Sequence, residues 1–141
     1  MTNFIQREDG SSGIEGKDYG AGAPVFVKIE YLAASVDKIA YVASRAMRVV
    51  GITGRVEAAG VDAGAVTAVV KKAASGTAIA SGTALHSGTF NLKGTAATNQ
   101  ELTLSTTSSD LDIPAGTAIG VDFTGVLTTA TGAICIALRW A

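Results

Sequence analysis

His86 and Cys135 are the only histidine and the only cysteine in the chain, and a search for chemistry starts with them. His86 could act as a general base for the adjacent Ser87 or for Ser81. A serine nucleophile also requires a carboxylate that orients the histidine and an oxyanion hole beside the nucleophile. The Gly-x-Ser-x-Gly elbow that carries such a serine in many hydrolases does not occur in the sequence. We therefore predict that His86 is an exposed turn residue and that the protein is not an enzyme.

The sequence offers equally little for metals and cofactors. One cysteine and one histidine are too few for the usual zinc sites. Asp110 and Asp112 could contribute to a calcium site, but the remaining ligands of a calcium loop are missing, so we expect a solvated turn. The stretch 76–82 lacks the Gly-Lys-Ser/Thr sequence of a phosphate loop. Cys135 lies between two isoleucines and is predicted to be a small buried or interface side chain. No catalytic residue, metal ligand or cofactor is predicted.

The content of charged and apolar residues indicates which kinds of partner the protein could bind. Charged residues make up 16% of the chain, against roughly 25% in typical soluble domains, so much of the surface must be uncharged and suited to contact with other subunits. The net charge is −1 and the only basic pair is Lys71–Lys72, which argues against a nucleic-acid partner. No apolar stretch approaches the roughly 20 residues of a spanning helix, and the N-terminus lacks a signal-peptide pattern. We expect synthesis in the cytoplasm and no membrane partner.

The elements that would have to position any site are strands. Apolar and polar residues alternate with a period of two in several short segments, and Gly, Thr and Ser separate them. Gly51 and Gly54 interrupt the longest segment and predict a bulge or bend. Segment 65–71 also has some helical character, and we prefer strand there because Thr67, Val69 and Val70 are β-branched. Segment 33–42 could start as a short helix capped by Ser35, and this alternative stays open. Predicted strands cover 25–31, 38–43, 45–57, 65–71, 89–92, 101–105, 117–124 and 134–140.

Seven or eight short strands with glycine-rich turns predict an all-β fold, a two-sheet sandwich that is jelly-roll-like. Ile39 and Tyr41 are expected on one face of their strand. Ile113–Gly116, with proline second and glycine fourth, predicts a type I turn. Trp140 is expected to close one end of the core. The predicted core contains Val27, Ile29, Val50, Ile52, Leu102, Leu104, Ile119, Val121, Phe123, Ile136, Leu138 and Trp140.

Residues 1–24 differ from the rest, because they hold five glycines and no pattern for burial. They predict a flexible or extended N-terminal arm, followed by a β-sandwich domain at 25–141. One interpretation is a disordered terminus. The other is an arm that becomes ordered on a partner, with apolar anchors and two cations as contacts. The predicted contact residues are Phe4, Ile5, Arg7, Ile14, Lys17 and Tyr19.

Three segments carry a resemblance to a known family: Leu111–Val121 (LDIPAGTAIGV), Phe123–Gly125 and Ile134–Trp140 (ICIALRW). With the Gly-Thr-Ala-rich middle, the stretch from Asp37 to Trp140 resembles the cement, or decoration, proteins of tailed bacteriophage capsids. The resemblance implies a structural virion protein on the outer capsid surface that clamps neighbouring major capsid subunits. It also implies a homodimer, and it makes the major capsid protein the partner of the predicted arm contacts.

One other class of function stays open, a carbohydrate- or receptor-binding β-module such as a fibre or adhesin domain. A trimeric shaft repeat or a surface cluster of aromatic residues would favour it. Aromatic residues make up 6% of the chain, too few to predict a stacking platform for sugars, and no shaft repeat occurs.

Overall fold

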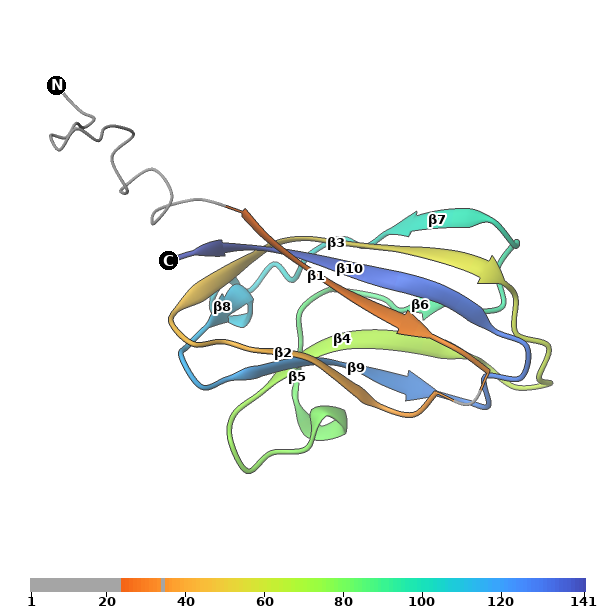
Figure 1. Ribbon diagram of the computed structural model, residues 1–141, viewed down its shortest axis with the longest axis horizontal. Coiled ribbons are helices and arrows are strands. Elements are labelled where there is room, and N and C mark those ends of the chain that lie inside the picture. The colour runs from red at the N-terminus through yellow and green to blue at the C-terminus, as the bar shows by residue number, and fades with distance from the viewer. Residues whose placement is uncertain (1–23, 34) are drawn as a thin grey trace, which may run out of the picture.

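The computed structural model describes residues 24–33 and 35–141 (Figure 1). Apart from Pro24, the predicted arm lies outside these residues. Its six predicted contacts also lie outside them: Phe4, Ile5, Arg7, Ile14, Lys17 and Tyr19. Pro24 is the first residue of the first strand, one position before the predicted start of the domain.

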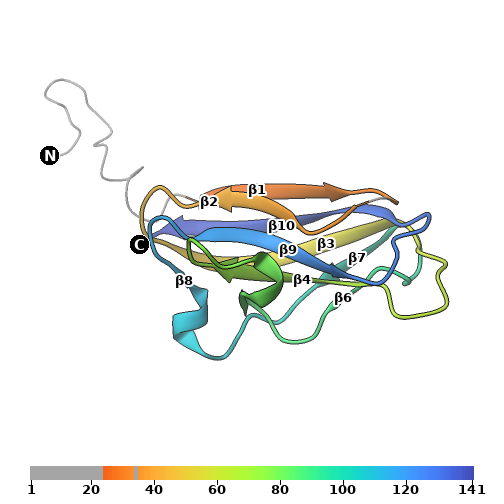
Figure 2. The same cartoon turned by 90° about the horizontal axis from the view of Figure 1, so that it is seen from below.

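The fold is an all-β sandwich of two antiparallel sheets with a jelly-roll-like arrangement, as predicted (Figures 1 and 2). The first sheet has the order β1 (Pro24–Tyr31), β10 (Thr131–Trp140), β3 (Met47–Ala58) and β7 (Thr98–Glu101), and β8 (Asp112–Ile113) also pairs with β3. The second sheet has the order β2 (Lys38–Val42), β9 (Ala118–Thr124), β4 (Thr67–Ala73) and β5 (Thr83–Ala84), and β6 (Phe90–Asn91) also pairs with β4. Two short 3-10 turns, η1 (Ile79–Ser81) and η2 (Ser108–Leu111), lie between strands.

The core lies between the sheets and follows from the alternation of the strands. In β4, for example, Ala68 and Val70 are fully buried while Val69 between them is half-buried. Of the two segments with some helical character, 33–42 contains strand β2, and strand β4 begins within 65–71 and ends at Ala73. Eleven of the twelve predicted core residues are either buried, as are Ile29, Ile52, Ile119, Val121, Ile136 and Leu138, or partly buried against the core, as are Val27, Leu102, Leu104, Phe123 and Trp140.

The twelfth predicted core residue, Val50, is 42% exposed, and the prediction was wrong there. In the β3–β10 pair, Ala137 is opposite Gly51 but Leu138 is opposite Val49. Val50 is therefore the extra residue of a β-bulge, and the inward position passes from Ile52 to Val49, three residues away. The bulge itself lies beside Gly51, where the glycine pattern predicted an irregularity.

A second bulge changes the faces of β2. Ile39 is opposite Gly120 and Tyr41 is opposite Ile119, so Ala40 has no partner of its own in β9. Ile39 is 57% exposed, whereas Tyr41 is half-buried and packs against the core. The two residues were expected on one face of the strand, and that expectation was wrong because one extra residue reverses the alternation.

Two local predictions are shifted along the chain. The strand expected at 101–105 is β7 at Thr98–Glu101, although the N–H of Leu102 still bonds to the carbonyl of Ile52. The expected type I turn at 113–116 lies one residue later, because the N–H of Thr117 donates to the carbonyl of Pro114. Gly116 is then the third residue, and its φ of 83° is that of a type II turn.

Candidate interaction surface

The sandwich is closed along one side by a strand segment that joins the two sheets. After β7, Leu104 forms an isolated antiparallel bridge with His86, which follows β5 in the other sheet. The N–H of Ser87 donates to the carbonyl of Thr103, and the N–H of Ser105 donates to the carbonyl of Leu85. Backbone groups that would otherwise be left at two sheet edges are paired with each other here.

His86 is part of this closure and is 4% exposed, so the prediction of an exposed turn residue was wrong. β5 pairs with β4 at Lys71 and Lys72, and β6 pairs with it at Thr67 and Ala68, which leaves a gap between them. The N–H of Val70 meets Nε2 of His86 in that gap, at 2.9 Å. The imidazole is therefore a hydrogen-bond acceptor that completes the edge of β4, and burial lowers its pKa.

The opposite side of the sandwich is open. Among residues 24–33 and 35–141, β1 pairs with no strand other than β10, and β2 pairs with no strand other than β9, so both sheets end in an edge strand on this side (Figure 2). We call β1, β2 and the connection 32–37 between them the open edge. Residues 1–23 join the described chain here, at Pro24. Such unpaired edges are ready templates for pairing with another chain.

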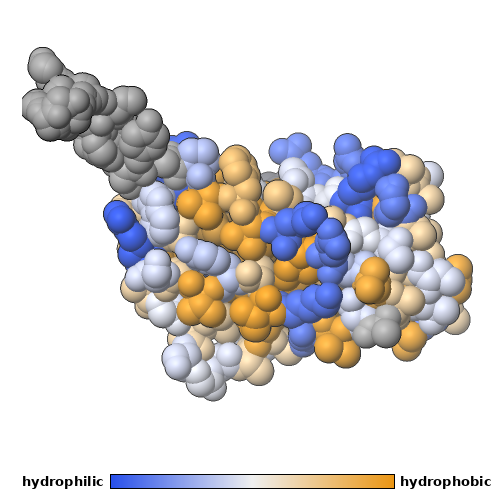
Figure 3. All heavy atoms as spheres, viewed as in Figure 1, coloured by the Kyte–Doolittle hydropathy of each residue, from blue (hydrophilic) through white to orange (hydrophobic). Residues whose placement is uncertain are grey.

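Apolar side chains gather on the open edge, and Figure 3 shows them as orange patches over β1 and β2. Four apolar residues of the edge strands are half-buried and pack against the core: Val25, Val27, Ala40 and Tyr41. Among the eight large apolar side chains that are exposed in the described chain, five belong to this edge: Phe26 (68%), Leu32 (63%), Val36 (73%), Ile39 (57%) and Val42 (56%). A concentration of apolar surface of this kind is typical of a protein interaction site.

A short row of charges crosses the apolar surface. Nζ of Lys28 lies 2.7 Å from Oε2 of Glu30 on the same strand. This hydrogen bond raises the pKa of Lys28 and lowers that of Glu30. Nζ of Lys38 donates to the carbonyl oxygen of Glu30 at 2.9 Å and so bridges from β2 to β1. Of these contacts, the hydrogen bond of Lys38 is the one that links the two edge strands.

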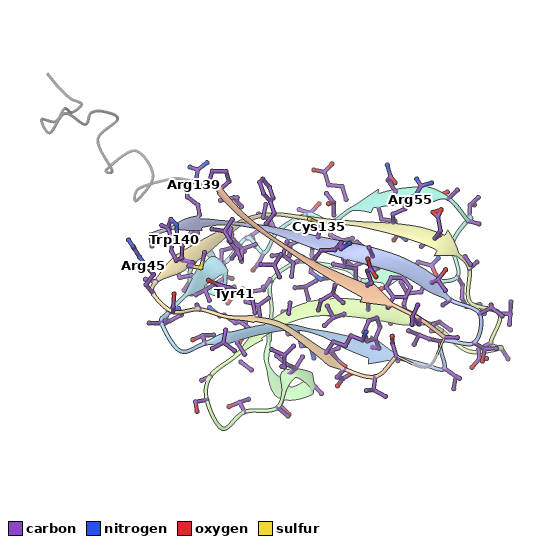
Figure 4. All side chains as sticks on the ribbon, in the orientation of Figure 1. Tyr41, Arg45, Arg55, Cys135, Arg139 and Trp140 are labelled. Carbon is purple, nitrogen blue, oxygen red and sulfur yellow. The ribbon has the colours of Figure 1, made fainter. Side chains whose placement is uncertain are left out.

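The outer face of the first sheet carries a shallow groove of about 600 Å³. Two small residues of β10, Ala133 and Cys135, line it together with Lys28, Arg55 and Glu101. Cys135 and Arg55 are labelled in Figure 4. Cys135 is half-buried, and its Cα is opposite Lys28 on one side and Thr53 on the other. No oriented base lies beside the thiol among these lining residues, so the groove offers a polar surface and no nucleophilic pair.

The other sequence candidates have structural partners. Asp110 accepts a hydrogen bond from the hydroxyl of Ser105 at 2.6 Å, and Asp112 forms an ion pair with Arg48. Within 24–33 and 35–141, no group of three or more His, Cys, Asp or Glu side chains could hold a metal ion. In the same residues, no helix is long and apolar enough to cross a membrane.

Sequence reasoning pointed to the N-terminal segment and missed the open edge. Phe26 could have been found, because its strand alternates and its neighbours Val25 and Val27 point inward. Ile39 could not, because its exposure depends on the bulge at Ala40, and nothing in the local sequence marks that bulge.

No protein-family model and no curated protein matches the chain. Two solved structures are similar in shape. One is a chain of the cyanophage Pam1 capsid asymmetric unit, with a TM-score of 0.49 and 12% identity over 86% of this chain and 87% of that one. The other is from Bacillus endospore appendages, which are disulfide-linked pili, with a TM-score of 0.40 and 17% identity over 84% of this chain and 86% of that one. At these scores and identities, neither similarity assigns a function to this chain.

Proposed function

We propose that this protein is a structural, non-enzymatic virion protein that binds the outside of a phage capsid and clamps neighbouring major capsid subunits. The observation that carries the proposal is the open edge, where five exposed apolar side chains lie on two edge strands and on the connection between them, next to the point where residues 1–23 join the described chain. The resemblance of Leu111–Val121 and Ile134–Trp140 to cement proteins supports the choice of a capsid as the partner.

The physical role of such a clamp is simple. A protein that binds the assembled capsid, and not its dissociated subunits, stabilises the assembly by mass action. Ile39 and Val42 would lose their contact with water on binding, at roughly 25 cal/mol for each Å² of apolar surface removed. Residues 1–23 would add contacts on a second subunit, because their length allows an extended reach of at most roughly 80 Å.

The test compares the heat and chemical resistance of capsids with and without the protein. An Ile39→Glu, Val42→Glu double variant should bind capsids more weakly and lose the stabilising effect. The matched control is Val61→Glu, because Val61 is 66% exposed and lies outside the open edge. Equal resistance of capsids with and without the wild-type protein would refute the clamp, and equal binding by the double variant would refute the role of the open edge.

The N-terminal segment is tested separately. A chain that lacks residues 1–22 should keep the thermal midpoint of the free domain and bind capsids less tightly. If the shortened chain unfolds, these residues are an integral part of the domain. If it folds and binds with unchanged affinity, the segment has no role in attachment and the clamp works through the sandwich alone.

The glycan-binding alternative has less support. Sugar recognition by aromatic residues needs an open ring face. In Figure 4, Tyr41, Arg45 and Trp140 lie toward one end of the sandwich. The guanidinium of Arg45 covers one face of the Trp140 ring, 4.8 Å from its centroid, and both aromatic side chains are half-buried against the core. Binding of glycans by the free protein, without binding to capsids, would favour this alternative over the clamp.

A further inference from the structure

The free side of β1 has backbone hydrogen-bonding groups that no strand of the described part of the chain satisfies. In an antiparallel pair, the backbone N–H and C=O of successive residues point to opposite sides of the strand. The carbonyl of Glu30 points toward β2, because it accepts a hydrogen bond from Lys38. The backbone groups of Lys28 and Phe26, two and four residues earlier, therefore also point to the free edge. The side chains of the same residues face outward from the sandwich.

Four outward side chains follow one another along this edge: Phe26, Lys28, Glu30 and Leu32. Phe26 and Leu32 are exposed apolar residues, and Lys28 and Glu30 between them have opposite charges. The order apolar, cation, anion, apolar is complementary to itself when the strand is reversed. A second copy of β1 that runs antiparallel would therefore present matching side chains.

Only one register uses this complementarity. With a two-fold axis at Ile29, Lys28 lies opposite the second copy's Glu30, and Phe26 lies opposite the second copy's Leu32. An axis at Lys28 or at Glu30 places like charges opposite each other, which is destabilising. An axis at Val27 places Phe26 opposite Lys28. An axis between two residues pairs an outward side chain with an inward one, which the pleat does not allow.

The chain itself limits how far the backbones can pair. The N–H of Leu32 donates to Oγ of Ser35, and the carbonyl of Leu32 accepts from the N–H of Ser35, so the N–H of Leu32 is not available to a second copy. Lys38 occupies one lone pair of the Glu30 carbonyl, which leaves the second one for another donor. Backbone pairing is thus centred on Lys28 and Glu30 of each copy, with apolar contacts on either side.

We propose that the protein forms a two-fold dimer through β1, with the axis at Ile29, Lys28 against the second copy's Glu30 and Phe26 against the second copy's Leu32. The two first sheets join into one continuous sheet. The interface is small, so the dimer dissociates on dilution. The proposal deepens the proposed function by naming the form that would act on a capsid, but the dimer is tested on the free protein and does not depend on capsid binding.

The first experiment is sedimentation of the full-length protein over a range of concentrations. Lys28→Glu and Glu30→Lys should each weaken association about tenfold, because each puts two like-charged pairs into the symmetric interface. The double variant Lys28→Glu, Glu30→Lys restores opposite charges and should associate like the wild type. The control is Arg55→Glu, since Arg55 forms a similar pair with Glu57, 3.2 Å apart, on β3, inside the sheet. Arg55→Glu should leave association unchanged.

The second experiment tests the register in a Cys135→Ala background. Phe26→Cys and Leu32→Cys proteins are mixed and oxidised. Opposed residues in an antiparallel pair have Cα atoms roughly 4.5–5.5 Å apart, within the range of a disulfide. The mixture should give a cross-linked heterodimer, and neither protein alone should cross-link efficiently.

The dimer is overturned if the wild type stays monomeric up to about 1 mM, the weak end of specific association. It is also overturned if the charge variants associate like the wild type, or if Phe26→Cys cross-links with itself as well as in the mixture. A wild-type dimer that fails to stabilise capsids would refute the proposed function and leave the dimer standing. A protein that stabilises capsids but stays monomeric would refute the dimer and leave the proposed function standing.

Discussion

Nε2 of His86 accepts a hydrogen bond from the backbone N–H of Val70 at 2.9 Å, and this bond fills a gap in the ladder of β4. A nitrogen that accepts carries no proton, so the folded protein holds the neutral imidazole with its proton on Nδ1, 3.3 Å from the carbonyl of Ser87. The imidazole and the ring of Phe90 pack in a T-shaped arrangement, with centroids 5.9 Å apart. The hydrogen bond to Val70 therefore depends on His86 staying neutral in the folded protein.

Protonation of His86 should destabilise the fold. Burial lowers its pKa in the folded state, so at acidic pH the unfolded chain takes up a proton that the folded chain does not. The contribution of His86 to the free energy of unfolding is complete above about pH 6.5 and is lost as the pH falls from there through the lowered folded pKa. Urea midpoints at about pH 7.5 and about pH 5.5 measure it.

His86→Gln is the control for this pH dependence, because its amide can accept a hydrogen bond and does not titrate. The variant should lose less stability than the wild type between the two pH values. If both proteins lose the same amount, His86 is not the group responsible.

Gly132→Ala should be strongly destabilising. A Cβ at Gly132 would lie 2.1 Å from the carbonyl oxygen of Arg55 and 2.5 Å from the hydroxyl of the buried Tyr31. We expect a loss of roughly 1–3 kcal/mol, as for other overpacked sites. Gly51→Ala on β3 is the matched control, because its Cβ would meet only Ala137, at 3.7 Å. Thermal or urea unfolding of the two variants checks this, and equal stability would contradict it.

The bulge in β3 predicts that truncating two adjacent valines changes the free energy of unfolding by very different amounts. Val49→Ala should cost roughly 2 kcal/mol, because Val49 is 1% exposed and its truncation leaves a cavity. Val50→Ala should change the free energy of unfolding by less than about 0.5 kcal/mol, since exposed positions tolerate substitution. Urea denaturation of both variants gives the comparison. A larger loss at Val50 would mean that the bulge is elsewhere.

Trp140→Ala should cost roughly 1–3 kcal/mol, less than the roughly 3–5 kcal/mol of a fully buried tryptophan. The ring is half-buried against the core and carries Arg45 on one face. Arg45→Ala alone should cost less than about 1 kcal/mol, the value of an exposed cation–π contact. Unfolding of both variants is the measurement, and a loss above about 4 kcal/mol for Trp140→Ala would show that the ring is core.

The sequence by itself determined the class of fold and most of the core. Alternation of apolar and polar residues is a local property, and it suffices to show that Ile136 and Leu138 point inward and that Phe26 points outward. It also determined that glycines break β3 near residue 51. These features depend on the geometry of one strand, in which side chains alternate regardless of what lies beside it.

Only the tertiary structure decided which residues the bulges displace, where His86 lies and which side of the sandwich is open. Val50 is exposed because the pairing of β3 with β10 leaves Val50 without an opposite residue. Ile39 is exposed because the pairing of β2 with β9 leaves its neighbour Ala40 without one. His86 is buried because β5 and β6 leave one N–H of β4 unpaired, 16 residues earlier in the chain. Each of these depends on pairing between segments distant in sequence, and a local pattern holds no information about which edge a strand will meet.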